Sequence, residues 1–147
     1  MPYEFKTIQV VEFADTDMAG IVHFANFFRY MEVTEHAFLR SLGLSVHMRD
    51  GERTLGMPRV SASCDFTQPL RFEDRVEVHL RVREKKRKSV TYDFVFRKLN
   101  GTPAVEVARG SLTVVCVVID EHRGTLKAAP LPEAFDRQVE VAPAGVT

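Results

Sequence analysis

The sequence predicts a single α+β domain in which an antiparallel sheet of about five strands wraps around one long helix. One observation is a run of apolar residues at three- and four-residue steps near the N-terminus, which is the period of an amphipathic helix. Another is the alternation of apolar and polar residues through most of the C-terminal half, which is typical of strands. A length of 147 residues fits one domain, which we expect to span residues 1–147.

The first predicted strand covers residues 5–13 and leads into residues 15–20, which are rich in turn formers. Asn26 is placed to cap the start of the helix that follows, and Gly43 is placed to end it. No second helical pattern matches this one in length, so we expect the sheet to bury the helix. Its broad apolar face is made of Phe24, Phe27, Phe28, Met31, Phe38 and Leu42.

The remaining chain is predicted to form mostly strands. Residues 45–56 are polar and irregular, and strands are then expected at residues 59–68, 75–82, 89–98 and 104–119. Beyond residue 130 the chain carries Pro132 and Pro143 and no clear periodicity. We therefore expect residues 130–147 to form a frayed tail.

Composition argues against several classes of protein. Twenty Lys plus Arg balance twenty Asp plus Glu, and a protein that binds nucleic acid non-specifically usually has a basic excess. Cys64 and Cys116 lie far apart and no His has metal-ligand spacing, so we expect buried free thiols and no metal. The longest apolar stretch, residues 112–119, is too short to span a membrane, and the N-terminus lacks a signal-peptide core. These features favour a cytoplasmic protein.

Two carboxylates, Asp15 and Asp17, lie between the first strand and the helix, near the positive end of the helix dipole. A carboxylate beside unpaired backbone N–H groups can attack a carbonyl or take a proton from an attacking water molecule. Gly20 suits a backbone that must approach a ligand closely. The alternative is that both aspartates only stabilise turns, as Asp often does. No nucleophile-elbow, Walker or dinucleotide-binding motif competes with this site.

The wider run of residues 11–27 resembles the signature of the 4-hydroxybenzoyl-CoA thioesterase family. Further similarity lies at Glu32, at residues 40–43 and at residues 56–58. The resemblance implies a hotdog fold, which is a long helix wrapped by an antiparallel sheet. It also implies a homodimer, often paired into a homotetramer, with active sites at the subunit interface.

The same resemblance assigns roles to several residues. Asp17 matches the catalytic aspartate of the family, as nucleophile or general base, and the main-chain N–H of Phe24 matches the donor to the thioester oxygen. The implied reaction is hydrolysis of an acyl-CoA. The sequence does not distinguish an aromatic from an aliphatic acyl group. Coenzyme A belongs to the substrate, and no separate cofactor is expected. An acyl-CoA-binding protein without turnover is the alternative.

Three polar residues in or just after the signature each have two interpretations. His23 stands where the broad-specificity branch of the family has Tyr, so it is either a polar substrate contact or a partly buried ring with one hydrogen bond. Asn26 and Glu32 are candidates to support the site or to cap the helix. None of the three identifies the acyl group.

A basic turn lies where the predicted strand at residues 75–82 leads into the predicted strand at residues 89–98. Its six cations are Arg81, Arg83, Lys85, Lys86, Arg87 and Lys88. Such a run is often only a solvated connection, since edges and turns commonly carry Lys and Arg. The family resemblance places the nucleotide-binding residues at Lys86, Arg87 and Lys88, where cations would pair with coenzyme A phosphates. A docking surface for a protein or nucleic acid is a further alternative, although no interleaved aromatic residues support nucleic-acid binding.

Overall fold

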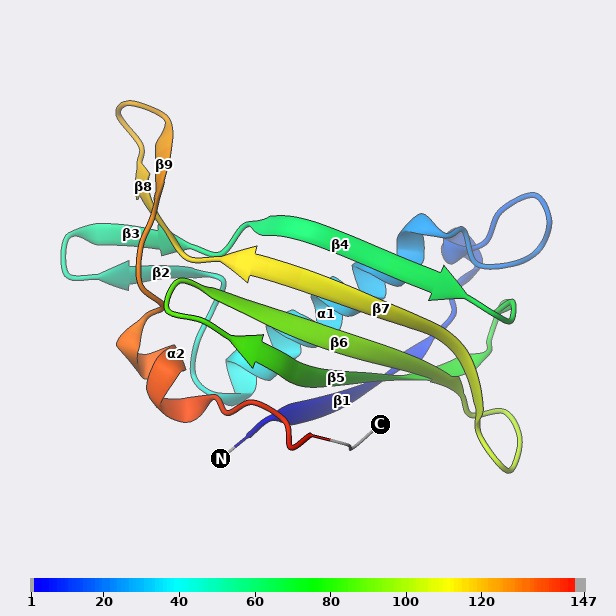
Figure 1. The fold of residues 1–147 in the computed structure, drawn as a ribbon. Coiled ribbons are helices and arrows are strands. Elements are labelled where there is room, and N and C mark those ends of the chain that lie inside the picture. The colour runs from blue at the N-terminus through cyan, green and yellow to red at the C-terminus, as the bar shows by residue number, and fades with distance from the viewer. Residues whose placement is uncertain (1, 145–147) are drawn as a thin grey trace.

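The computed structural model describes residues 2–144 and contains two antiparallel sheets (Figure 1). The larger sheet has the strand order β1-β5-β6-β7-β4. Its strands are β1 (Glu4–Val10), β4 (Arg59–Phe66), β5 (Arg75–Lys85), β6 (Ser89–Lys98) and β7 (Val105–Val115). The smaller sheet has the order β2-β3-β8-β9, formed by β2 (His47–Asp50), β3 (Arg53–Gly56), β8 (Val117–Asp120) and β9 (Thr125–Ala128).

Helix α1 (Ala25–Ser41) lies across one face of the larger sheet (Figure 1). Its apolar stripe is buried against alternate residues of β5 and β6, because side chains at every second position of a strand share one face. The helix ends where Leu44 N–H donates to Leu39 O (2.9 Å) and Gly43, at φ 75°, donates to Arg40 O (3.0 Å). This is a Schellman motif, and it confirms Gly43 as the helix terminator. The long helix under an antiparallel sheet is therefore confirmed.

A side chain of the helix lies directly against the backbone of the larger sheet at Gly110 of β7. A Cβ atom added there would lie 2.1 Å from Met31 Cε and 3.0 Å from Ser63 O. Met31 is fully buried, so its side chain has little room to move aside. The absence of a side chain at Gly110 thus lets Met31 of α1 pack directly on the backbone of β7.

The strand prediction is wrong in three places. Residues 45–56 form β2 and β3 instead of an irregular stretch, and β9 lies in a segment where no strand was expected. The strand predicted at residues 104–119 is divided at Cys116, whose N–H donates to Lys88 O (2.8 Å) and whose carbonyl accepts from Ala129 N (2.9 Å). These bonds turn the chain from the larger into the smaller sheet, and apolar alternation alone does not reveal such a break.

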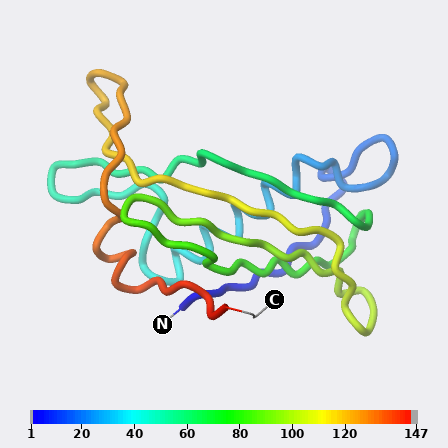
Figure 2. The backbone as a smooth tube through the Cα atoms, viewed as in Figure 1, coloured from blue at the N-terminus to red at the C-terminus, as the bar shows by residue number. Residues whose placement is uncertain are grey.

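The expectation that the chain frays from residue 130 is wrong as far as residue 139. Helix α2 (Glu133–Gln138) forms there, and Leu131, Phe135 and Val139 are buried in the core. Lys85 Nζ donates to the carbonyl oxygens of Asp136 (2.9 Å) and Val139 (2.8 Å). The tail then runs back beside the start of the chain (Figure 2). Residues 145–147 of the predicted tail lie outside the described residues.

Both cysteines are free thiols, as predicted. Burial raises the pKa of the Cys64 thiol to about 12 and also raises that of Cys116, so neither is a ready thiolate at neutral pH. Within residues 2–144, no helix combines the length and apolarity needed to cross a membrane. A cytoplasmic location stays a prediction.

Candidate active site

Asp17 is the first residue of the tight turn that closes a hairpin between β1 and α1. Its N–H donates to Ile21 O (2.9 Å), and Gly20 N–H donates back to Asp17 O (2.9 Å). Gly20 has φ 78°, which a residue with a side chain rarely adopts, so the turn requires glycine. An Asp side chain suits the first position of such a turn because it can accept a backbone N–H, here that of Ala19 at 2.8 Å. The local sequence therefore fixes Asp17 at the start of this turn.

The turn occupies only one oxygen of the Asp17 carboxylate. Oδ1 accepts the Ala19 N–H, whereas Oδ2 has no hydrogen bond or ion pair with any of residues 2–144. The side chain is exposed. The turn-stabilising and reactive roles considered from the sequence are thus compatible, because a different oxygen serves each.

The first backbone N–H groups of α1 are only partly satisfied. Ala25 N–H donates to His23 Nδ1 (3.3 Å), and Asn26 N–H donates to His23 O (2.9 Å). The Phe24 N–H makes no hydrogen bond within the described residues. This N–H can therefore donate to a bound oxyanion, and the positive potential of the helix dipole favours negative charge at the same place.

The expectation that Asn26 caps the helix is wrong, because α1 begins before it at Ala25. Its side-chain amide instead donates to Asp15 O (2.8 Å). His23 is exposed, and its ring lies 4.8 Å from the ring of Phe24. A contact between His23 and substrate stays a prediction.

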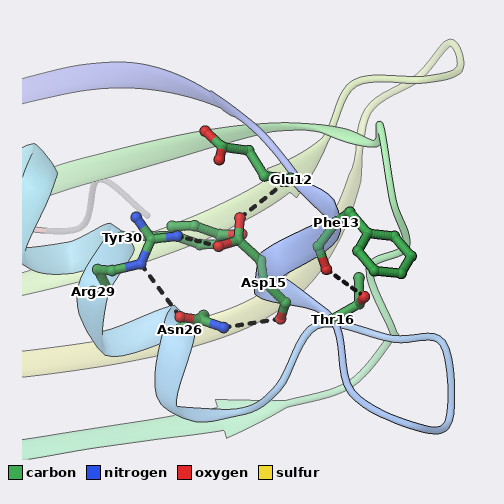
Figure 3. A network of polar contacts seen from close by, with 7 residues as sticks. All are labelled: Glu12, Phe13, Asp15, Thr16, Asn26, Arg29 and Tyr30. Atoms are coloured by element: carbon green, nitrogen blue, oxygen red, sulfur yellow. Dashed lines mark hydrogen bonds and ion pairs between the residues drawn. The ribbon is translucent and has the colours of Figure 1, made fainter.

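Asp15, unlike Asp17, is buried at the centre of a polar network (Figure 3). Its Oδ2 accepts from Glu12 N (3.0 Å) and Tyr30 Oη (2.8 Å), and its Oδ1 pairs with Arg29. Burial alone would raise the pKa of this carboxyl, but the bonds from Glu12 and Tyr30 and the Arg29 charge outweigh it and hold the pKa below its usual range. Asp15 is therefore a fixed anion that fastens the 3₁₀ turn Phe13–Asp15 to α1.

A cavity of about 390 Å³ opens beside Asp17 and the start of α1. The rings of Phe24, Phe27 and Phe66 form much of its wall, and those of Phe27 and Phe66 meet edge to face at 4.9 Å. The remaining lining residues are Asp17, Ile21, Val22, Thr67, Gln68, Pro69 and Leu70. An apolar pocket with a few polar groups is the usual form of a small-molecule site.

A larger cavity of about 620 Å³ lies between α2, the β2–β3 hairpin and the end of α1. Asp17 does not line it, and the only helix that begins there is the six-residue α2. The C-terminal end of α1, which also lies there, repels anions. We therefore assign the chemistry to the smaller cavity.

A family model for the thioesterase-like superfamily matches residues 11–139. The chain belongs to this superfamily. The match confirms the family resemblance and, with it, the hotdog fold. Among its relatives, a putative esterase of Aquifex aeolicus is 37% identical over 99 residues, which cover 67% of this chain and 74% of that protein.

Two solved structures of the superfamily are similar along most of their length. A 1,4-dihydroxy-2-naphthoyl-CoA thioesterase from Synechocystis is 27% identical with a TM-score of 0.76, covering 90% of this chain and 93% of that one. A gentisyl-coenzyme A thioesterase is 29% identical with a TM-score of 0.73, covering 89% of this chain and 98% of that one. The similarity therefore includes both the strand–turn–helix region and the sheet.

Within one chain, the basic turn lies far from Asp17. Val10, at the end of β1 that leads to Asp17, pairs with Arg75 at the start of β5, whereas the turn follows Lys85 at the other end of β5. Ten residues of strand span roughly 33 Å. Arg87 and Lys88 are exposed, and Lys86 lies 3.2 Å from Glu84. The structure thus does not bring the predicted clamp and the predicted carboxylate together in one chain.

Glu32 is also separate from the cavity that Asp17 and Phe24 line. It lies eight residues beyond Phe24, which is roughly 12 Å along the helix. Its carboxylate lies 3.6 Å from Arg59 of β4, which also pairs with Glu35. Glu35 is only 1% exposed. Burial raises the pKa of Glu35 to about 7, although the Arg59 charge opposes this rise and the Glu32 charge adds to it. Glu32 and Glu35 therefore join the helix to the edge strand instead of supporting Asp17.

Sequence reasoning missed Arg29 and Tyr30 as partners of Asp15, and it missed Glu35. A Tyr on the apolar face of a helix carries a hydroxyl that needs a partner when buried, and that signal was present. Glu35 sits three residues beyond Glu32, on the same face of the helix. The wall at residues 66–70 has no motif, so only the fold reveals it.

The raised pKa of Glu35 predicts a pH-dependent stability. The folded protein holds a proton that the unfolded chain has released between pH 4.5 and about 7. The resulting stabilisation is complete below pH 4.5 and is lost as the pH rises through 7, with a difference of roughly 3 kcal/mol in the free energy of unfolding. Glu35→Gln cannot ionise, so its urea unfolding should lack this decline between pH 5 and pH 8. Glu133→Gln, at an exposed position, should keep the wild-type slope; an unchanged slope in Glu35→Gln would contradict the assignment.

Proposed function

We propose that this protein hydrolyses acyl-CoA thioesters, with Asp17 as the reactive carboxylate and the Phe24 N–H as the donor to the thioester oxygen. The observation that carries the proposal is that one apolar cavity is lined by both residues. Among residues 2–144, one oxygen of the Asp17 carboxylate and the Phe24 N–H at the start of α1 have no hydrogen-bond partner. The superfamily membership and the thioesterase names of the relatives support the same reaction.

The chemistry follows from these two groups. With the carbonyl oxygen at the Phe24 N–H, negative charge that develops on that oxygen is stabilised by the N–H and by the helix dipole. The Asp17 carboxylate then either attacks the carbonyl carbon or takes a proton from a water molecule that attacks it. In the first case the C–S bond breaks, a mixed anhydride forms, coenzyme A leaves as its thiolate, and water hydrolyses the anhydride. In both cases the products are a carboxylic acid and coenzyme A.

Asp17→Asn should lower kcat at least a hundredfold. The amide is neither a nucleophile nor a base, but its oxygen can still accept the Ala19 N–H, so the unfolding temperature should stay close to that of the wild type. Release of free thiol from a panel of acyl-CoAs measures the rate. Asp120→Asn is a matched control, because Asp120 also accepts backbone N–H groups in an exposed turn, from His122 and Arg123. Wild-type rates in Asp17→Asn would contradict the mechanism, and acyl-CoA binding without any turnover would favour a binding protein.

The acyl group is proposed to be aromatic. The cavity walls carry the rings of Phe24, Phe27 and Phe66, and aromatic rings favour stacked or edge-to-face neighbours. Two similar structures are named as thioesterases of 1,4-dihydroxy-2-naphthoyl-CoA and gentisyl-CoA, and both of these acyl groups are hydroxylated aromatics. Thr67 and Gln68 supply polar side chains at the same wall for such hydroxyls.

Aromatic acyl-CoAs should therefore show kcat/KM values at least tenfold above those of aliphatic acyl-CoAs of similar size. Phe66→Leu keeps an apolar wall but removes the ring, so it should reduce this ratio by about threefold or more, since an aromatic pair contributes about 0.5–1.5 kcal/mol beyond its buried area. Phe72→Leu is the control, because Phe72 is an exposed aromatic that does not line the cavity. Equal rates for both classes of acyl-CoA would exclude aromatic preference.

We further propose that the protein is a homodimer joined through β4. This edge strand pairs only with β7 within the described residues, and its Val60 and Phe66 are 62% and 45% exposed. A free edge of this kind readily pairs with a second strand. The other edge strand, β1, contributes no residue to the cavity, whereas Phe66 and the residues directly after β4 do. Association of dimers into a homotetramer stays a prediction.

Antiparallel pairing of two β4 strands would bring the basic turn of one chain near Asp17 of the other. Strand β4 runs from the end of the sheet that carries the turn to the end that carries the cavity, since Arg59 and Val90 both pair with Val114. A twofold axis would place the start of each β4 beside the end of its partner. Only β7 separates β4 from β6, so a partner's turn would lie roughly 10 Å from the shared edge. Lys86, Arg87 and Lys88 would then serve the cavity of the other subunit.

Mixed dimers test this arrangement. One chain carries Asp17→Asn and the other carries Lys86→Glu with Arg87→Glu, and the rate is measured at an acyl-CoA concentration below the wild-type KM. If the turn acts across the interface, one of the two sites in each mixed dimer is intact, and about half of the wild-type rate should return. If it acts within one chain, neither site is intact and no recovery should occur. Arg123→Glu, a charge reversal on the β8–β9 hairpin, should leave KM unchanged as the control.

A further inference from the structure

A further cavity, of about 520 Å³, adjoins the cavity beside Asp17. Gln68 and Pro69 line both cavities and so form the partition between them. Two cations, Arg71 and Lys98, line this cavity, whereas the cavity beside Asp17 is lined by none. The remaining lining residues of the further cavity are Asn100, Gly101, Val105 and Val107.

The cations of this cavity exceed the anions that pair with them. Lys98 Nζ lies 3.4 Å from Asp74 Oδ2. The Arg71 guanidinium has no hydrogen bond or ion pair with any of residues 2–144. Asp74 is already satisfied by Arg71 N (2.7 Å) and by the Asn100 side-chain amide (3.0 Å). One unpaired guanidinium therefore remains at the cavity wall.

The wall that carries Arg71 is fixed to the catalytic hairpin and to the sheet. Leu70 O accepts from Val22 N (2.8 Å), and the N–H groups of Thr67 and Gln68 both donate to Val107 O (2.9 and 3.2 Å). Asn100 Oδ1 accepts from Arg75 N (2.9 Å) on the far side. A preorganised wall loses little conformational entropy when a ligand binds.

We propose that this cavity binds an oxyanion of the substrate, a phosphate or a carboxylate, that extends past Gln68 and Pro69 from the thioester. The proposal rests on the proposed function, because it takes Asp17 as the position of the thioester. A guanidinium can donate two parallel N–H groups to either kind of oxyanion, and Lys98 adds a second charge. Two parts of a substrate carry such a group: the coenzyme A moiety carries phosphates, and a dicarboxylic acyl group carries a distal carboxylate.

This site differs from the basic turn in its dependence on assembly. Arg71 and Asp17 belong to the same chain and to adjoining cavities, whereas Lys86, Arg87 and Lys88 lie at the other end of the sheet. The Arg71 site would therefore hold an oxyanion in an isolated subunit as well as in a dimer.

Charge reversal at Arg71 tests the proposal. Arg71→Glu should raise KM at least tenfold for thioesters that carry the relevant oxyanion, and Arg71→Lys should recover part of the loss. The kcat/KM for a neutral N-acetylcysteamine thioester should stay within twofold of the wild type. Arg75→Glu introduces the same charge change at an exposed residue at the same end of the sheet but outside the cavity, and it should have no such effect.

Two substrate pairs identify the source of the oxyanion. A specific loss for acyl-phosphopantetheine relative to acyl-pantetheine identifies a phosphate, and a specific loss for succinyl-pantetheine relative to butyryl-pantetheine identifies a carboxylate. An equal loss on all thioesters, or no loss on any, would overturn the proposal.

Calorimetric binding of coenzyme A and of succinyl-pantetheine to wild-type and Arg71→Glu protein gives a readout that needs no turnover. Suppose that the wild type hydrolyses no thioester but binds one of these ligands, and that Arg71→Glu binds it more weakly. The proposed reaction then fails, while the oxyanion site stands.

Discussion

The structure depends first on the buried carboxylate of Asp15. It joins the 3₁₀ turn to α1 through Glu12 N, Tyr30 and Arg29, and its carbonyl accepts from His23 N (2.9 Å) and from the Asn26 amide. Both ends of the hairpin that carries Asp17 are thereby attached to one residue. A charged acceptor with several donors is strongly held when buried, and loss of one partner leaves an uncompensated group. The position of Asp17 relative to the Phe24 N–H follows from this attachment.

The two aspartates of the hairpin show how environment separates the roles of identical side chains. Asp15 is buried and fully hydrogen-bonded, so its charge is already neutralised and it has no oxygen to offer a substrate. Asp17 is exposed, and a single backbone N–H holds it in place. Reactivity needs an orientation that is fixed and an oxygen that is free, and only Asp17 combines them. The positive end of α1 lies beside Asp17 and favours negative charge on a bound oxygen, which neither carboxylate can do.

The sequence predicted the parts that are governed by local chemistry. The period of α1, its end at Gly43 and the turn at Asp17 and Gly20 depend on residues close together in the chain. The break at Cys116, the burial of Phe135 and the pairing of Glu35 with Arg59 depend on contacts between distant segments, which periodicity does not encode. Asn26 illustrates the boundary, because its residue type suited a cap but tertiary contact with Asp15 gave it another partner. The wall at residues 66–70 is likewise a product of strand order.

The strand order also explains why one chain holds an incomplete set of the predicted residues. A strand as long as β5 places the groups at its two ends roughly 33 Å apart, and no side chain spans that distance. The two proposals hold the substrate in different ways: by a partner chain that pairs across β4, or by cations of the same chain beside the cavity. The first requires a dimer. The second requires only one chain, with Arg71 and the partition at Gln68 and Pro69. They can also act together, since a thioester of coenzyme A carries phosphates at more than one point along its length.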